Sequence, residues 1–280
     1  MPTIYFPQLA ADGFIVERGS TFGDAYETAK TDSSVAQRTA WAWRGAGLDR
    51  LPTDPLGKWT FAYTSLTDAE RDVLVEFFRA RRGRYESFAL MDPYGNLVPR
   101  SEDFTHSSWE KNGTTPGASV TDPFGGNLAT SVASSGSNAN LVATVIPDGD
   151  AAGFVICGSV WVKAPAAQTL SVGFVDSGFS VLDNRIWDLP ADTWRRIWCT
   201  TTLATNSYIR LLIGGFSTWS GQTLQLFGAQ CVPLPGPAAY VRTPGRAGLR
   251  RKVRFDQDAI EIRTLGPNQH ATNAQLLEVY

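Results

Sequence analysis

Residues 65–96, SLTDAERDVLVEFFRARRGRYESFALMDPYGN, decide how the rest of the sequence is interpreted. Thr67 followed by Glu70 has the spacing of a capping box, in which each side chain accepts a hydrogen bond from a free backbone N–H of the first turn. Arginines fill the last turn, where cations suit the helix dipole, and Gly83 follows as a stop signal. The stretch predicts a helix at 68–82, a strand at 85–91 and a turn at 92–96.

The apolar residues of this helix recur at helical spacing and predict one buried face. The stripe comprises Ala69, Val73, Phe77 and Ala80, widened by Leu74 and Phe78.

Short apolar runs separated by glycine and proline surround the helix and predict strands. Trp59, Phe61 and Tyr63 alternate along one run, which is typical of a half-buried strand. The strands expected before and after the centre of the chain are 4–6, 14–17, 26–29, 34–44 and 58–64, then 249–255, 259–265 and 275–280.

The composition changes between residues 99 and 244, where charge is sparse and Gly, Ser, Thr, Asn and Trp dominate. Strands are expected at 154–163, 169–175, 194–203, 208–214 and 223–232. Short strands at this spacing favour a β-sandwich or jelly roll. In the first of them we expect one face to be core, Phe154, Ile156, Val160 and Val162, and the other half-exposed, Cys157, Ser159, Trp161 and Lys163.

Three parts of the sequence resemble known families. Residues 77–96, FFRARRGRYESFALMDPYGN, are similar in residue order to a segment of the distal-tail and minor tail proteins of long-tailed bacteriophages and related particles. Residues 22–27, FGDAYE, resemble a hairpin of the same family, with Ala25 where glycine is usual. Residues 102–109 and 227–244 resemble the two ends of carbohydrate-binding-module-like jelly rolls of phage tail and fibre proteins.

These resemblances imply a mainly β protein in two domains. Residues 1–98 with 245–280 would form a β-rich scaffold with one helix, and residues 99–244 an inserted jelly roll. The scaffold would assemble with copies of itself into a ring, expected to be a hexamer, between the tail tube protein and the hub or baseplate proteins. The chain would be a structural protein of the virion tail tip, assembled in the host cytoplasm, and the jelly roll would bind a host-surface glycan.

Composition argues against several other classes. The chain has 25 basic and 27 acidic residues, a net charge of −2, so nucleic acid is not an expected partner. No window approaches the roughly 20 apolar residues of a membrane-spanning helix, and with no basic start or long apolar run in residues 1–14 we expect no secretion signal. Cys157, Cys199 and Cys231 are too few and too widely spaced for a disulfide framework or a zinc site, so we expect buried thiols.

The sequence offers little catalytic chemistry, and we expect neither an enzyme nor a cofactor or metal. Only His106 and His270 are available for a serine-type triad. A glycosidase would need two facing carboxylates, for which Asp176, Asp183 and Asp188 are the choices. With Asp148 and Asp150 these could also form a calcium site, but without EF-hand spacing solvated turn carboxylates are preferred.

Aromatic and basic residues supply the candidate binding surfaces. Trp161, Trp187 and Trp219 lie in polar surroundings and are the candidate sugar-stacking rings, whereas Trp109 and Trp198 are expected in the core. Arg79, Arg81, Arg82 and Arg84 are the candidate ring contacts, because arginine is enriched at interfaces. The alternative is a soluble lectin or polysaccharide-processing enzyme with a carrier domain.

Overall fold

The computed structural model describes residues 3–9, 15–20 (backbone), 57–136, 138–204, 208–219, 221–245 and 248–279 of the 280-residue chain. The described chain is mainly β with one α-helix, as predicted. It divides into two compact units. The sandwich unit comprises Met1–Gln8 and Ala89–Arg250, and the sheet–helix unit comprises Leu9–Phe88 and Arg251–Tyr280.

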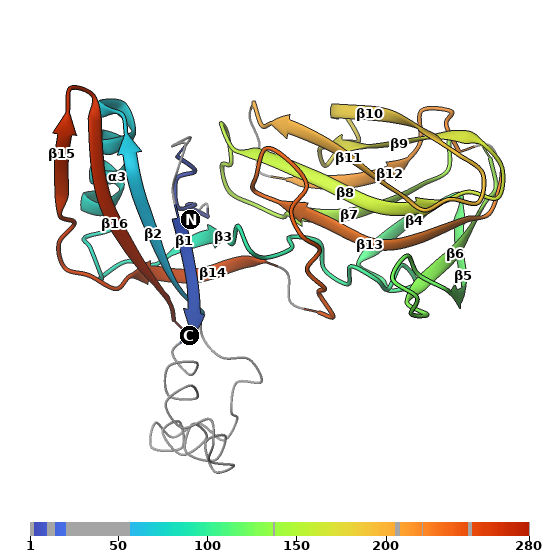
Figure 1. Cartoon of the computed structure of the whole chain (residues 1–280), viewed down its shortest axis with the longest axis horizontal. Helices are drawn as coiled ribbons and strands as arrows, with labels where there is room; N and C mark the ends of the chain where they lie inside the picture. Colours follow the sequence, from blue (N-terminus) through green and yellow to red (C-terminus); the bar gives the residue numbers. More distant parts are fainter. Residues whose placement is uncertain are drawn as a thin grey trace, which may run out of the picture. The chain divides into compact units, whose positions relative to one another are not determined.

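An antiparallel sheet forms the body of the sheet–helix unit (Figure 1). Its strands follow the order β1, β2, β16, β14, and β15 pairs with β16. The carboxyl-terminal strand β16 therefore pairs directly with β2, near the other end of the chain. The bounds are β1 Ile15–Ser20, β2 Gly57–Leu66, β14 Leu249–Phe255, β15 Ile262–Gly266 and β16 Gln269–Glu278.

Strand β2 shows the predicted alternation, with Trp59, Phe61 and Tyr63 buried on one face. Helix α3, Asp68–Ala80, begins with the predicted capping box. The backbone N–H of Thr67 donates to Glu70 Oε2 at 2.9 Å, and the N–H of Glu70 donates to Thr67 Oγ1 at 3.2 Å. These two bonds satisfy donors that the first turn otherwise leaves free.

The predicted apolar stripe of α3 is confirmed at Leu74, Phe77 and Phe78, and it was wrong at the three smaller residues of the stripe. Leu74 is fully buried, whereas Val73 is 47% exposed, and Ala69 and Ala80 are also exposed. The aromatic residues decide which side packs, because Phe78 meets the ring of Phe255 at a centroid distance of 4.8 Å. The buried face is therefore centred on Leu74 and the two phenylalanines that follow it.

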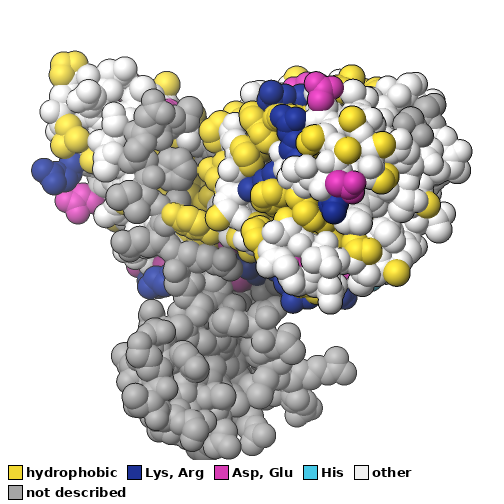
Figure 2. Space-filling view, turned by 45° about the vertical axis from the view of Figure 1, so that its right-hand side comes forward, with side chains coloured by type: hydrophobic (Ala, Val, Ile, Leu, Met, Phe, Trp, Pro, Cys, Tyr) yellow, Lys and Arg dark blue, Asp and Glu magenta, His cyan; other side chains and the backbone are white. Residues whose placement is uncertain are grey.

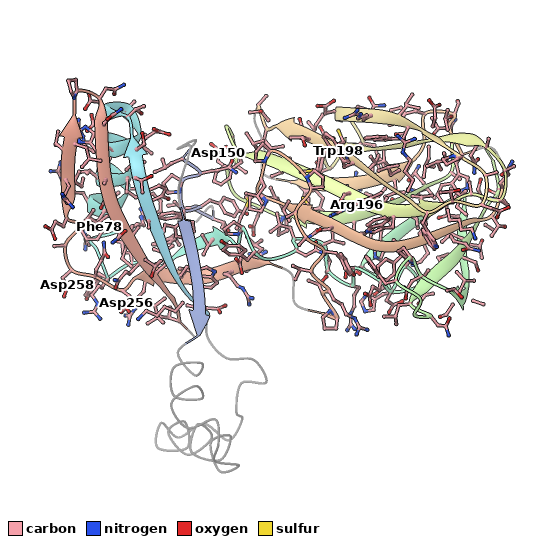
Figure 3. The ribbon with its side chains drawn as sticks, viewed as in Figure 1. Phe78, Asp150, Arg196, Trp198, Asp256 and Asp258 are labelled. Atoms are coloured by element: carbon pink, nitrogen blue, oxygen red, sulfur yellow. The ribbon has the colours of Figure 1, made fainter. Side chains whose placement is uncertain are left out.

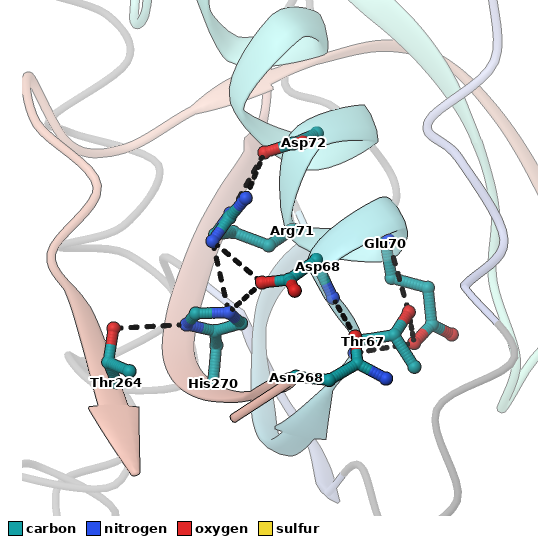
Figure 4. Close-up of polar contacts among 8 residues, drawn as sticks. All are labelled: Thr67, Asp68, Glu70, Arg71, Asp72, Thr264, Asn268 and His270. Carbon is teal, nitrogen blue, oxygen red and sulfur yellow. Dashed lines mark hydrogen bonds and ion pairs between the residues drawn. The ribbon is translucent and has the colours of Figure 1, made fainter. Parts of the chain in front are cut away.

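The first turn of α3 is also tied to the β15–β16 hairpin by polar contacts (Figure 4). Buried His270 on β16 holds its Nε2 2.7 Å from Asp68 Oδ1, and its Nδ1 lies 3.2 Å from the Thr264 hydroxyl. Arg71 reaches the same carboxylate at 2.9 Å. Hydrogen bonding from His270 is the main cause that lowers the pKa of Asp68, with the charge of Arg71 adding to it.

Two five-stranded antiparallel sheets form the sandwich unit (Figure 1), which is the β-sandwich class predicted. One sheet has the order β10, β9, β12, β7, β4, and the other β11, β8, β13, β6, β5. Strand β3, Phe88–Met91, precedes them. The ten strands are β4 Trp109–Asn112, β5 Thr114–Val120, β6 Ala129–Ser134, β7 Asn140–Ile146, β8 Val155–Lys163, β9 Gln168–Val175, β10 Val181–Leu189, β11 Arg195–Thr202, β12 Ile209–Gly214 and β13 Leu224–Val232.

The core lies between these sheets and includes Ile156, Val160 and Val162, as predicted for β8. The opposite face of β8 departs from the prediction, because Cys157 and Ser159 are buried as well. Residues 235–239 cross this face and bond to it: the Thr200 hydroxyl donates to Pro235 O at 3.1 Å, and Gln230 Nε2 donates to Ala239 O at 2.9 Å. All three cysteines are buried free thiols, as expected.

The buried amide of Asn96 organises the point where the chain enters the sandwich. Its Nδ2 donates to Ala229 O at 2.9 Å and Val241 O at 3.0 Å. Its Oδ1 accepts from the N–H groups of Val98 and Cys231, both at 3.0 Å. Buried polar groups need hydrogen-bond partners, and here one side chain supplies them to four backbone groups from three segments.

The chain leaves the sandwich beside the place where it enters. Ser101 N–H donates to Thr243 O at 3.1 Å, and Thr243 N–H donates to Ser101 Oγ at 2.9 Å. The unit bounds differ from the predicted domain bounds in three short segments, 1–8, 89–98 and 245–250, which group with the sandwich. Part of the reason is Gln8, whose Nε2 donates to Val155 O and Pro233 O at 3.0 and 2.7 Å.

Several sequence predictions fall outside the described residues, namely the hairpin at 22–27 and the strands at 26–29 and 34–44. Within the described part, no helix is both long and apolar enough to cross a membrane.

Candidate functional site

The outer face of the β11–β8–β13 sheet presents aromatic and polar side chains in rows. Strand pairing places Arg196 opposite Trp161, and Trp161 opposite Phe227. The next row along β8 pairs Lys163 with Gln225. Because side chains alternate between the two faces of a strand, Trp161 and Lys163 project from the same face.

Three aromatic rings stand at one side of this face. Phe124, 67% exposed, packs edge-on against Trp161 at 5.7 Å and against Phe227 at 5.8 Å between centroids. Trp161 itself is half-buried. The predicted candidate Trp161 is therefore part of an aromatic cluster on this face and not an isolated ring.

A hollow of about 630 Å³ includes Lys163 and Gln225 of the next row, and we call it the trough. Its lining combines one indole with amide, hydroxyl and ammonium groups. The lining residues are Ser119, Val120, Thr121, Asn127, Lys163, Trp194 and Gln225. Within the described chain, the side chains of Trp194 and Gln225 make no hydrogen bond, so their polar groups are available to a ligand.

Arg196 bounds the face on the other side and is committed to the fold. Its guanidinium donates to Ala238 O at 2.7 Å, Ser159 Oγ at 3.0 Å and Gln230 Oε1 at 2.6 Å. Burial lowers the pKa of Arg196. Arg196 and Trp198 both lie on β11 (Figure 3). Arg196 is hydrogen-bonded to residues 235–239, which cross this face, whereas the side chain of Trp198 is not.

A second cluster joins the edge strands β10 and β11, and we call it the arginine–tryptophan clamp. The Trp187 and Trp198 rings lie 5.7 Å apart and tilted by 54°. The exposed Arg185 guanidinium sits over both, at 4.1 Å from Trp187 and 4.7 Å from Trp198. Arg195 approaches Trp187 from 5.0 Å and donates to Asp188 O. Figure 2 shows such basic side chains among hydrophobic ones on the sandwich surface.

The clamp changes two sequence interpretations. Trp187, a predicted sugar platform, already has guanidinium groups against its ring. Trp198, expected in the core, is only half-buried. Trp109 is buried as expected, at 1% exposure.

Trp219 was wrongly predicted as a sugar-stacking residue. Its side chain is 0% exposed, and its Nε1–H donates to Gln222 O at 2.9 Å. The ring belongs to the core of the sandwich although its neighbours in the sequence are polar, so polarity along the chain did not indicate exposure.

The four candidate ring arginines divide into two kinds. Arg81 pairs with Glu86 at 3.2 Å, and Arg84 bridges Asp256 at 3.2 Å and Asp258 at 3.3 Å (acids labelled in Figure 3). Arg82, 73% exposed, approaches Glu86 at 3.6 Å, and Arg79 is exposed on α3 with no ion pair to another described residue. Only Arg79 and Arg82 are therefore placed to meet a partner.

The acidic side chains do not assemble a catalytic pair on β10. Asp183 and Asp188 are five residues apart in continuous register, so they project from opposite faces of the strand. Asp176 caps its own turn by accepting from Gly178 and Ser180 N–H at 2.8 and 2.9 Å. These backbone bonds, that of Ser180 first, lower the pKa of Asp176.

Metal ligands are likewise not grouped in the described residues, which contain no set of three or more His, Cys, Asp or Glu side chains suited to an ion. Asp150 is exposed and accepts the N–H of Ala152 at 2.9 Å. His106 bonds to Ser108 at 3.0 Å within its own loop.

No family model matches the sequence, and a search of curated proteins found no match. Among solved structures, similarity extends over about half of the chain. The arabinose-bound α-L-arabinofuranosidase MgGH51 is 14% identical with a TM-score of 0.41, covering 50% of this chain and 26% of its own. The enzymatically active domain of tailspike protein 4 of bacteriophage CBA120 is 14% identical, TM-score 0.39, covering 52% and 22%.

A third similar structure is a complete module. The CBM22-1 xylan-binding domain of Paenibacillus barcinonensis Xyn10C is 14% identical, TM-score 0.38, with 51% of this chain and 96% of that domain covered. This chain spans about a quarter of the length of the first two proteins.

Proposed function

We propose that the sandwich unit binds carbohydrate in the trough. The supporting observation is the joint presence of an open hollow, a half-buried indole at Trp194, the uncommitted amide of Gln225 and the ammonium group of Lys163, which lies 4.0 Å from Asp192. Sugar rings stack their C–H faces on aromatic side chains, and amide and ammonium groups bind hydroxyls. A concave site with a few converging polar groups is the usual form of a small-molecule site.

We further propose that the chain is a structural, non-enzymatic component of the tail tip of a phage or phage-like particle. The resemblance of residues 77–96 to distal-tail proteins supports this, and that run forms the end of α3 and the strand after it. The sheet–helix unit would form a hexameric ring between tail tube and hub or baseplate proteins. The sandwich would engage a glycan of the host surface.

The carbohydrate proposal is tested by exposing the full-length protein to a glycan array. Binding to at least one glycan, with loss in Trp194→Ala and Gln225→Ala, is expected. Tyr85→Ala is the matched control, because Tyr85 is an 83% exposed aromatic residue of the other unit. Absence of any binding, or equal binding by all variants, would contradict the proposal.

The ring proposal is tested by the mass of the protein in solution. Reversing the two most accessible of these charges, Arg79→Glu with Arg82→Glu, is expected to reduce a ring to monomers. Arg185→Glu, a charge reversal in the sandwich unit, is expected to leave the mass unchanged. A monomeric wild-type protein would contradict the ring, and a monomer that cleaves its glycan would establish the enzyme alternative.

A further inference from the structure

The arginine–tryptophan clamp is a surface feature that the trough does not account for. Arg185 is exposed, yet its guanidinium is held against two indole rings, at 4.1 and 4.7 Å. Stacking fixes the plane of a guanidinium while leaving the N–H groups along its edge free. Such an arrangement presents donors in a fixed orientation.

No acidic side chain of the described chain neutralises these arginines. Neither Arg185 nor Arg195 forms an ion pair with a described residue, and Arg195 donates to the backbone oxygen of Asp188 at 2.5 Å. The carboxylate of Asp183, two residues before Arg185, accepts the N–H of Asn184 at 2.8 Å. An oriented arginine without an acidic partner fits a carboxylate or sulfate group, which a guanidinium binds through two parallel hydrogen bonds.

One residue of the trough lies directly before β11, the edge strand that carries part of the clamp. Trp194 lines the trough immediately before β11, and Trp198 of the clamp follows four residues later on the same face. Four residues of extended strand span about 13 Å, which an oligosaccharide of a few units covers. A glycan seated against Trp194 therefore has the clamp within reach of a neighbouring sugar.

We propose that the clamp binds the anionic group of an acidic polysaccharide, so that the glycan recognised by the trough carries carboxylate or sulfate groups. This inference rests on the proposed function and names its ligand class. Arg185 supplies the oriented donors, Trp187 and Trp198 hold its plane, and Arg195 adds a second positive charge.

The test compares matched glycans on the full-length protein. Tetragalacturonate and its fully methyl-esterified form share one sugar backbone and differ in the charge of the carboxyl groups and in the added ester methyl groups. A panel of sulfated chains with their desulfated forms extends the comparison to sulfate. The acidic member of at least one pair is expected to bind ten-fold or more tightly than the neutral member, with the difference shrinking as salt rises.

Variants locate the effect. Arg185→Gln with Arg195→Gln is expected to abolish the preference for the acidic member while leaving neutral binding unchanged, whereas Trp194→Ala weakens both. Lys252→Gln removes one exposed charge from the other unit and is the control. Equal binding of acidic and neutral members overturns the inference and leaves the proposed function standing. Binding of no glycan overturns both, and a preference that survives the double substitution overturns the clamp.

Discussion

Two groups of arginines, one from each unit, differ in what they contact, although the sandwich unit also holds paired arginines, Arg210 with Glu110 and Arg242 with Glu102. In the sheet–helix unit, Arg71, Arg81 and Arg84 pair with acidic side chains at 2.8–3.3 Å. In the sandwich unit, Arg185 and Arg195 lie on tryptophan rings and have no described acidic partner. The difference teaches that a count of basic residues does not locate a binding surface. What matters is whether the fold already supplies the counter-charge.

The largest expected effect concerns the sandwich unit. Asn96→Ala leaves two carbonyl oxygens, one of them partly exposed, and two buried N–H groups without their partner. Each unsatisfied buried group costs about 1–3 kcal/mol, so we expect a loss above about 4 kcal/mol, seen in denaturant unfolding of the sandwich. A loss below about 1 kcal/mol would mean that Asn96 does not organise the chain there.

A smaller effect is expected in the sheet–helix unit and tests which face of α3 packs. Leu74→Ala should cost about 2–5 kcal/mol, as a fully buried leucine does, whereas Val73→Ala should stay within about 0.5 kcal/mol because its side chain is largely exposed. Thermal unfolding of the two variants gives the comparison. An equal loss of stability in the two variants would mean that Val73 is as buried as Leu74, as the sequence predicted.

The capping box of α3 should contribute less to stability than Asn96 or Leu74 does. Thr67→Ala removes the acceptor of the Glu70 N–H bond and is expected to cost about 1 kcal/mol. Thr105→Ala, on an exposed loop of the sandwich unit, is a control for loss of a hydroxyl away from a helix. An unchanged unfolding midpoint in Thr67→Ala would contradict the capping account.

The smallest expected effect is a pH dependence at Asp68. Its pKa is lowered in the folded state, so the unfolded chain binds this proton more readily. The stabilisation is therefore complete above the ordinary carboxyl pKa of about 4 and is lost as pH falls through the lower folded value. Unfolding of wild type and Asp68→Asn between pH 2 and about 6 should converge at the acidic end, and a constant difference would contradict this assignment.

Much of the fold follows from local sequence signals. The capping box, the alternation of Trp59, Phe61 and Tyr63, and the strands of the sandwich depend on neighbours along the chain, which a sequence displays. The helix face followed only in part, because Ala69, Val73 and Ala80 satisfy the same periodicity as the phenylalanines that pack. Size decided between them, since burying large aromatic side chains stabilises more than burying alanine.

The site was harder to predict, because it depends on contacts between distant segments. Trp161 lies on the outer face of β8, as its place on the polar side of that strand predicted, whereas Trp219 is buried and Trp187 is contacted by arginines. Trp194 was missed, although it alternates with Arg196 and Trp198 and so shares their face. The trough forms where residues 119–127 lie beside β8 and β13, and no pattern of neighbouring residues in the sequence predicts that these segments come together.

Titration calorimetry of the full-length protein with its array-selected glycan tests the central claim most directly. We expect Trp194→Ala to weaken binding at least ten-fold, a loss of about 1.4 kcal/mol or more, while Tyr85→Ala binds like wild type. Wild-type affinity in Trp194→Ala would show that the outer face of the β11–β8–β13 sheet is not where the carbohydrate binds.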